Sequence, residues 1–210
     1  MRRIVWSKVL LFAVCLAPLA MLAWDVWRAL AGDLEALGAD PGEAIVHHLG
    51  EWGIRLLIAT LAVSSIARLT GRPSLIRYRR MVGLFAFVYV ALHFSAYFGI
   101  LAGAELAALL GDLSERPYII AGGGALLILI PLALTSTRAA QRRLRHNWRR
   151  LHRLVYVAAV LAVLHIAWLA KVSYVDAYIY GSLALLLLGE RVFQWVKTSQ
   201  KAQQNSRQNV

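Results

Sequence analysis

Long uncharged stretches are the dominant pattern along this chain of 210 residues. Four of them contain no Asp, Glu, Lys or Arg over 16, 24, 21 and 17 residues: Val9–Trp24, Met81–Ala104, Pro117–Thr137 and Leu154–Ala170. A helix needs about 20 predominantly apolar residues to cross the hydrocarbon core of a bilayer, with a range of roughly 17–25. The pattern therefore predicts membrane-spanning helices at these four positions.

Two further segments are apolar but carry charges. The stretch Ala44–Ala67 contains Glu51 and Arg55, which are four residues apart and can pair on one face of a helix. The stretch Ala177–Val196 is broken only by two charged residues near its end. We therefore predict an all-α integral membrane protein, a bundle of six transmembrane helices.

The basic residues are concentrated on alternate connections between these segments. Nineteen of the 23 Lys and Arg residues lie at the N-terminus, in the second and fourth connections, and from the end of the sixth segment onward. The other side holds the remaining four, together with ten of the eleven acidic residues, all except Glu190. Because basic loops stay in the cytoplasm, both termini are predicted to be cytoplasmic. Six helices satisfy this topology, whereas five or seven would separate the termini.

Composition alone leaves two classes open, a nucleic-acid binder and a membrane protein. The chain is 60% hydrophobic and 16% charged, with a net charge of +12 and a mean hydropathy of +0.59. The arginine-rich segment Arg142–Arg150 lies between two predicted spans, where topology and contacts with anionic lipid explain it. We therefore expect no nucleic-acid partner. We predict a membrane domain over residues 1–197 and a disordered, Gln- and Asn-rich cytoplasmic tail over residues 198–210.

The first apolar run has an alternative interpretation as a removable signal peptide. The basic N-terminus, the apolar run and the segment Ala29-Leu30-Ala31 resemble the three parts of such a peptide. Two tryptophans and two charged residues, however, lie between the apolar run and that segment. This interruption favours a helix that is retained.

Cysteine usage and glycine motifs restrict the cofactors. Cys15 is the only cysteine, so the chain can form neither an intramolecular disulfide nor the C-x-x-C-H attachment site of c-type haem. Any bound haem must be held without covalent bonds. The run Gly122-Gly123-Gly124 lies in an apolar stretch, and we interpret it as a site of close helix packing.

Two histidines lie inside predicted spans, where ionisable residues are costly and are candidates for function. His93 and His165 follow the cytoplasmic starts of their helices, near Met81 and Leu151, by 12 and 14 residues. Both therefore lie roughly 18–21 Å into the membrane. Two imidazoles at one depth can bind a haem iron from opposite sides. The alternative is a non-redox transporter or assembly factor in which these histidines only hold helices together.

A third histidine, His152, precedes His165 by 13 residues, or about 20 Å along a helix. The equivalent level of the third predicted helix carries Arg79 and Arg80 and no histidine. Three roles for His152 remain open: an axial ligand of a second haem, a partner of a haem propionate, and an interfacial residue.

Four segments together resemble one known family. They are Arg77–Leu84, Arg116–Ile119, Leu134–Thr137 and Trp148–Tyr156. Their residues and order resemble the MsrQ (YedZ) family of the ferric-reductase-like transmembrane group, over essentially the whole chain to about residue 196. The resemblance implies a non-catalytic, b-haem electron-transfer subunit in the bacterial inner membrane. It further implies electron flow from the quinone pool to a periplasmic molybdopterin enzyme, MsrP, which reduces methionine sulfoxide in proteins, and binding of flavin mononucleotide (FMN).

The resemblance assigns the haem histidines to His93, His152 and His165. The wider group has two histidines on each of two helices, and this chain lacks the one at the level of Arg79 and Arg80. One haem b is therefore expected, and a second remains an alternative. The arginine-rich cytoplasmic loops are a candidate site for the FMN phosphate.

These expectations together define an outward electron path. A quinol or a reduced flavin would deliver electrons near His152 and the cytoplasmic arginines, and they would leave through the His93/His165 site to a docked partner. The acidic outer loops are either the docking surface for this partner or a consequence of topology alone. His47 and His48 are either a quinone or docking contact or solvated interfacial residues.

Overall fold

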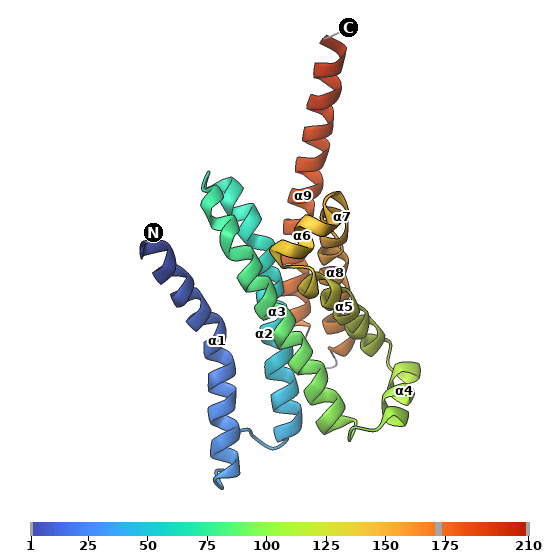
Figure 1. Cartoon of the computed structure of the whole chain (residues 1–210). Helices are drawn as coiled ribbons and strands as arrows, with labels where there is room; N and C mark the ends of the chain where they lie inside the picture. The colour runs from blue at the N-terminus through green and yellow to red at the C-terminus, as the bar shows by residue number, and fades with distance from the viewer. Residues whose placement is uncertain (1, 171–173, 209–210) are drawn as a thin grey trace.

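The computed structural model describes residues 2–170 and 174–208, and every regular element within these ranges is a helix (Figure 1). The long helices are α1 (Arg2–Leu30), α2 (Pro41–Leu69), α3 (Ile76–Ala96), α5 (Pro117–Leu134), α8 (Val155–Leu169) and α9 (Val175–Gln208). Shorter elements connect them: η1 (Pro73–Leu75), the π-helical turn η2 (Tyr97–Leu101), α4 (Leu106–Glu115), α6 (Arg138–Leu144) and α7 (His146–His152).

Local sequence signals explain where several helices begin. The Asp40 side chain accepts a hydrogen bond from the backbone N–H of Glu43 at 2.9 Å, and a proline follows Asp40 at the first position of α2. A proline also opens α5. The Thr137 side chain caps α6 by accepting a bond from the Ala140 N–H at 3.2 Å. Gly71, with φ of +65°, allows the tight turn after α2.

The structure confirms a multi-pass membrane protein. Within the described residues, five stretches are long and apolar enough to cross a bilayer: Val5–Leu30, Pro41–Leu69, Pro73–Leu101, Pro117–Leu134 and His146–Leu169. Each of these contains or overlaps one of the first five predicted spans. The sixth predicted span lies within α9, which is not among these five stretches. A sixth crossing stays a prediction, as does the division of the chain at residue 197.

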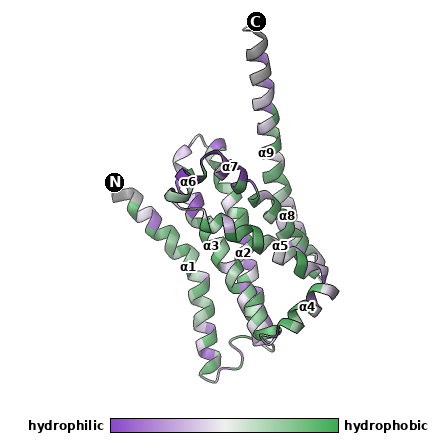
Figure 2. Cartoon of the chain, turned by 45° about the vertical axis from the view of Figure 1, so that its right-hand side comes forward, coloured by the Kyte–Doolittle hydropathy of each residue, from purple (hydrophilic) through white to green (hydrophobic). Residues whose placement is uncertain are grey.

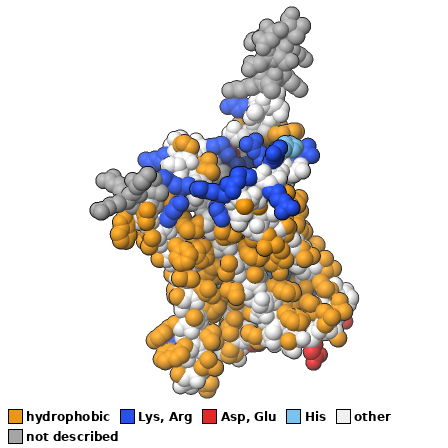
Figure 3. Space-filling model, in the orientation of Figure 1, with side chains coloured by type: hydrophobic (Ala, Val, Ile, Leu, Met, Phe, Trp, Pro, Cys, Tyr) orange, Lys and Arg blue, Asp and Glu red, His pale blue; other side chains and the backbone are white. Residues whose placement is uncertain are grey.

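Large apolar side chains cover the outside of the helices, as expected of a surface that faces lipid. Hydrophobic residues dominate the long helices in Figure 2 and form the broad flank of the molecule in Figure 3. Trp6, Leu127 and Leu185 are 71%, 70% and 73% exposed, respectively. In water such a surface would aggregate, whereas in a bilayer it is solvated by acyl chains.

Charge is segregated to the two ends of the molecule. Lys and Arg side chains form a band across one end in Figure 3, which we call the basic end, and acidic side chains appear at the opposite, acidic end. Both chain termini lie toward the basic end, together with α6 and α7 (Figure 1). The structure thus agrees with the charge pattern from which a cytoplasmic location of both termini is predicted.

Two helix hairpins, α2–α3 and α5–α8, form the centre of the bundle, and both run from the acidic end to the basic end and back. Small residues let their helices approach closely, because a Cβ on Gly53 would lie only 2.9 Å from the Val90 side chain. Ala158 and Ala159 of α8 are fully buried. Tyr89 of α3 is also fully buried.

Polar contacts fix the outer helices to this centre. The Tyr89 hydroxyl donates a hydrogen bond to the Cys15 carbonyl of α1 at 2.9 Å. Toward the basic end, Glu190 of α9 accepts hydrogen bonds from Ser65 and from the Arg68 guanidinium of α2. Arg55 of α2 donates to the Tyr180 hydroxyl of α9 at 3.1 Å.

Candidate functional site

His93 and His165 face each other in the interior of the bundle. His93 lies on α3 and His165 on α8, and their ring centroids are 6.1 Å apart. The two ring planes are nearly perpendicular, at 86°. The predicted pairing of the two intramembrane histidines is therefore present in the structure.

Each imidazole is anchored through its Nδ1 atom to a backbone carbonyl of the adjacent helix. The Nδ1 of His93 lies 2.8 Å from the Val46 carbonyl oxygen, and the Nδ1 of His165 lies 2.6 Å from that of Tyr118. A carbonyl can only accept, so both Nδ1 atoms carry the proton and donate it. In the described part of the chain, no hydrogen bond involves either Nε2. Both Nε2 lone pairs are therefore available to a metal, the arrangement typical of ligating histidines.

The spacing of the rings matches one metal ion held between them. Two metal–nitrogen bonds of about 2.0–2.1 Å, plus about 1.1 Å from each nitrogen to its ring centre, place the ring centres about 6.3 Å apart. The observed separation is 6.1 Å. Among the residues that the structure describes, no three His, Cys, Asp or Glu side chains come together. A two-histidine site fits a metal whose remaining ligands come from a cofactor such as haem, and it does not fit structural zinc.

The histidines line a cavity of about 500 Å³, which we call the histidine cavity. Its size lies within the range of cofactor pockets, about 300–1,000 Å³. Its interior wall is apolar, with Leu57, Val90, Phe94 and Leu129 among the lining residues. An apolar cavity with two convergent imidazoles suits a planar, mostly apolar ligand with an iron centre.

The histidine cavity has an internal two-fold pattern. Of the 28 described residues that line it, 22 form eleven pairs whose numbers differ by 72. The pairs include Gly50 and Gly122, Leu57 and Leu129, and the two histidines themselves. One member of each pair comes from the α2–α3 hairpin and its π-helical extension, and the other comes from α5–α8. The two hairpins therefore contribute corresponding positions to the cavity, and the residues are identical at the two histidines, the two glycines and the two leucines.

The outer rim of the histidine cavity is mostly acidic. Asp40, Glu43, Glu51 and Asp176 line it, together with Arg116. Tyr118 and Asp112 raise the pKa of the Arg116 guanidinium above its ordinary value, so this side chain stays charged. The rim therefore presents mostly negative charge at the outer side of the cavity that the histidine pair lines.

His47 and His48 differ in position. His47 lines the histidine cavity at its outer side. His48 points toward α1, where its Nε2 lies 3.0 Å from the Pro18 carbonyl oxygen. His48 thus has a structural contact between helices, and only His47 is placed near the candidate site. Whether His47 contacts a quinone or a partner stays a prediction.

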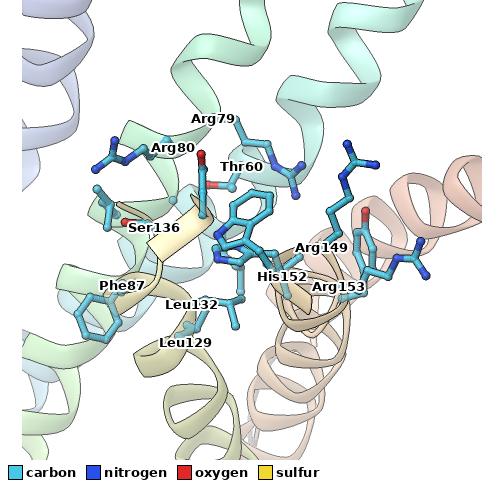
Figure 4. A pocket seen from close by; sticks show the side chains of 18 of the residues that line it. Thr60, Arg79, Arg80, Phe87, Leu129, Leu132, Ser136, Arg149, His152 and Arg153 are labelled. Atoms are coloured by element: carbon cyan, nitrogen blue, oxygen red, sulfur yellow. The ribbon is translucent and has the colours of Figure 1, made fainter. Parts of the chain in front are cut away.

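His152, Arg79 and Arg80 line a separate cavity of about 410 Å³ at the basic end (Figure 4). Arg149 and Arg153 also line this cavity, which we call the arginine pocket. Its inner wall is apolar and includes Leu57 and Leu129, which line the histidine cavity as well. The two cavities are therefore neighbours that share a wall made of one residue pair.

The imidazole of His152 is held differently from the other two. Its Nε2 lies 3.1 Å from the Thr135 hydroxyl, whose own proton is donated to the Pro131 carbonyl at 2.6 Å. The Nε2 must therefore be the donor in this contact. Trp148 stacks on the ring at a centroid distance of 4.1 Å and donates to the Thr135 carbonyl at 2.9 Å.

The position that corresponds to His152 in the other hairpin is Arg80, since their numbers also differ by 72. Other pairs in the arginine pocket are chemically unlike, such as Gly83 and Val155, and Leu84 and Tyr156. Among the described residues that line this pocket, His152 is the only histidine. The structure therefore places one predicted pair of histidines together and leaves the third apart.

The paired architecture was not found from the sequence. The signal was present as two glycines that each precede an intramembrane histidine by 43 residues, Gly50 with His93 and Gly122 with His165. From the sequence alone, the run Gly122-Gly123-Gly124 indicates close helix packing and does not identify a contact with a histidine. Gly122 does permit a close approach, and the group that approaches it is the His165 ring.

Comparison with known proteins gives consistent results. A family model described as ferric reductase like transmembrane component matches residues 49–163. The protein-methionine-sulfoxide reductase heme-binding subunit MsrQ of Xanthomonas euvesicatoria pv. vesicatoria is 42% identical over 196 residues, which are 93% of this chain and 89% of that protein. The protein of the same name from Caulobacter vibrioides is 44% identical over 194 residues, 92% of this chain and 90% of its own length. No solved structure matches this chain.

Proposed function

Because the chain belongs to the ferric reductase like transmembrane family and to the MsrQ proteins, we propose that it is the haem-binding electron-transfer subunit of a methionine sulfoxide reductase system. The observation that carries this proposal is the facing pair of imidazoles, His93 and His165, with both Nδ1 atoms anchored to carbonyls. The names of the relatives supply the haem and the reductase system.

We propose that His93 and His165 would hold the iron of one b-type haem through their Nε2 atoms. The cavity is apolar and its size fits, and the only cysteine, Cys15, is buried on α1, so no covalent attachment is available. Haem bound there supplies one-electron redox chemistry. The two Nδ1–carbonyl bonds hold the ring orientation, and the apolar wall excludes water from the metal.

The arginine pocket is the proposed entry point for electrons. Its four arginines suit an anionic group such as the phosphate of FMN, and Trp148 and Tyr156 offer aromatic surfaces to a flavin or a quinol ring. We propose that the reductant binds here, beside His152. A quinol oxidised here would release its two protons at the basic end and its two electrons, one at a time, toward the neighbouring cavity across the shared Leu57/Leu129 wall.

The acidic rim is the proposed exit. Reduction of one methionine sulfoxide to the thioether consumes two electrons and two protons and releases water. We propose that a periplasmic, MsrP-like molybdopterin enzyme performs this reduction while docked at the rim. We accordingly propose that the protein lies in the bacterial inner membrane with six spans and both termini in the cytoplasm, a topology that the charge pattern supports.

The visible spectrum of the purified protein tests the haem assignment. We expect a Soret band and, after reduction with dithionite, the bands of a six-coordinate b-type haem. His93→Ala and His165→Ala are each expected to remove most of the haem. His47→Ala is the matched control, because it deletes an imidazole that lines the same cavity but is not one of the two paired rings. A protein without haem after expression with ample haem, or two variants with full haem content, would refute the assignment.

Transfer to the partner is tested separately. The dithionite-reduced protein, freed of excess reductant, is mixed with the oxidised periplasmic enzyme and methionine sulfoxide in a stopped-flow instrument. We expect the reduced haem bands to decay with one methionine formed for every two electrons lost. Decay at the same rate without the enzyme would show that the electrons go elsewhere.

A further inference from the structure

Each histidine of the facing pair lies directly against a glycine of the neighbouring helix. A Cβ atom on Gly50 would lie 2.9 Å from the Nδ1 of His93, and one on Gly122 would lie 2.7 Å from the Nδ1 of His165. Real Cβ atoms essentially never approach another heavy atom so closely. These rings cannot easily withdraw, because each is also bonded to a carbonyl.

The glycine stands in a fixed relation to the carbonyl that anchors the histidine. Gly50 follows Val46 by four residues, and Gly122 follows Tyr118 by four residues. In an α-helix, residue i+4 lies one turn above the carbonyl of residue i, and its Cα–Cβ bond tilts back toward the helix N-terminus. A side chain at i+4 would therefore cover that carbonyl. Glycine leaves it open to an imidazole from outside the helix.

The same device occurs twice, once in each hairpin. The residue numbers of the carbonyl, the glycine and the histidine in the first set each differ by 72 from those of their counterparts in the second set. Gly124, which lies on the same helix as Gly122, shows no such contact with a histidine. A Cβ on Gly124 would lie 3.4 Å from the Leu161 side chain, an ordinary van der Waals distance. The repeated geometry indicates a specific requirement at Gly50 and Gly122.

We infer that Gly50 and Gly122 are positioning residues for the two histidines. By exposing the Val46 and Tyr118 carbonyls, they allow the Nδ1–H bonds that fix the tautomer, the ring planes and the direction of each Nε2. The inference rests on the proposed function for the metal between the rings. The two glycines are proposed to act only through the histidines, since a glycine has no side chain with which to bind a cofactor.

The test compares alanine at these positions with alanine at neighbouring glycines. Gly50→Ala and Gly122→Ala should displace the rings and weaken the Nδ1–carbonyl bonds. Changes of this kind around metal-binding histidines typically lower metal affinity or activity about 10- to 100-fold, so we expect the haem dissociation constant to rise by that factor. Gly124→Ala is the control on α5, and we expect it to bind haem within about two-fold of the wild type, because its Cβ fits.

Gly53→Ala separates ring displacement from simple crowding of α2 against α3. Its Cβ would lie 2.9 Å from the Val90 side chain, and its three nearest atoms all belong to Val90. Electron paramagnetic resonance of the oxidised protein reports the angle between the ligand planes, which is 86° in the structure. We expect the strongly anisotropic low-spin signal of perpendicular rings in the wild type and in Gly53→Ala, and a less anisotropic signal in Gly50→Ala.

The midpoint potential is the second readout, and it is independent of any partner enzyme. A weaker Nδ1–H bond makes the imidazole a poorer donor, so the potential should rise in Gly50→Ala and Gly122→Ala. Wild-type affinity, signal and potential in both variants would overturn the inference, as would equal changes in Gly53→Ala and Gly50→Ala. The His93→Ala and His165→Ala spectra decide the proposed function separately, because haem retained in them refutes the ligands themselves.

Discussion

Glu190 is the single acidic residue assigned to the basic end, and it joins α9 to the rest of the bundle. Its carboxylate accepts hydrogen bonds from Ser65 at 3.0 Å and from the Nε of Arg68 at 3.0 Å, with a further bond from the Arg68 Nη2. Arg191, the next residue, lies 3.9 Å from the same carboxylate. The group thus holds α9 against α2 at a point where most other side chains are apolar or positively charged.

The Glu190→Ala variant should destabilise the folded protein by about 2–3 kcal/mol. The ion pair with Arg68 contributes about 1 kcal/mol at most, because the side chains of Arg68 and Glu190 are 37% and 22% exposed. Ser65 is buried, and the loss of its acceptor leaves a hydroxyl without a full partner, at a cost of about 1–2 kcal/mol. Glu190→Gln keeps an acceptor for Ser65 and should cost only about 1 kcal/mol.

Reversible unfolding in mixed micelles with increasing sodium dodecyl sulfate measures these differences. Glu115→Ala is the control for loss of one carboxylate, because Glu115 is exposed and is the last residue of α4. We expect this surface change to alter the free energy of unfolding by no more than about 0.5 kcal/mol. If Glu190→Ala matches Glu115→Ala, the contacts of Glu190 do not hold α9 in place and the reasoning is refuted. Equal losses in Glu190→Ala and Glu190→Gln would show that the charge matters and the buried hydroxyl does not.

Three predictions concern the arginine pocket. His152→Ala should keep the wild-type haem-to-protein ratio, measured by the pyridine haemochrome assay, because its Nε2 is bonded to a hydroxyl; a halved ratio would assign His152 to a second haem. Arg80→His should leave that ratio unchanged, because the pocket differs from the histidine cavity in shape as well as in this ligand. The double variant Arg149→Gln/Arg153→Gln should weaken FMN binding, measured by flavin fluorescence, about 10-fold or more, and the remaining binding should depend less on salt.

The four uncharged runs and the apolar stretch Ala44–Ala67 were enough to locate five candidate membrane spans, because the bilayer imposes a length and a polarity on each span that local sequence must meet. The short helices α4, α6 and α7 and the π-helical turn at Tyr97–Leu101 were not predicted. They lie at or near the ends of spans, where neither lipid nor a repeating apolar face constrains the pattern.

The facing of His93 and His165 could be predicted from depth, because both helices start at the same membrane surface and rise by the same distance per residue. Their anchoring carbonyls could not. A backbone carbonyl has no sequence signature, and the Val46 and Tyr118 oxygens become acceptors only through the packing of α3 on α2 and of α8 on α5. The sequence left three roles open for His152, although it shows no histidine at the level of Arg79 and Arg80 to serve as a partner.

Residues of both hairpins line each of the two cavities. The cavities differ in how closely the corresponding residues of the two hairpins match. Around the facing histidines three of the pairs are identical, namely His93 with His165, Gly50 with Gly122 and Leu57 with Leu129, and the other pairs differ in residue type. Around His152 the corresponding residue is Arg80, and the arginines come from α3 and from α7 with the turn after it. The matched histidines suit the proposed haem, and the arginines of the second cavity suit the proposed reductant, which combines an apolar ring with an anionic or polar group. The shared Leu57/Leu129 wall makes the two proposed sites neighbours, as electron transfer between them requires.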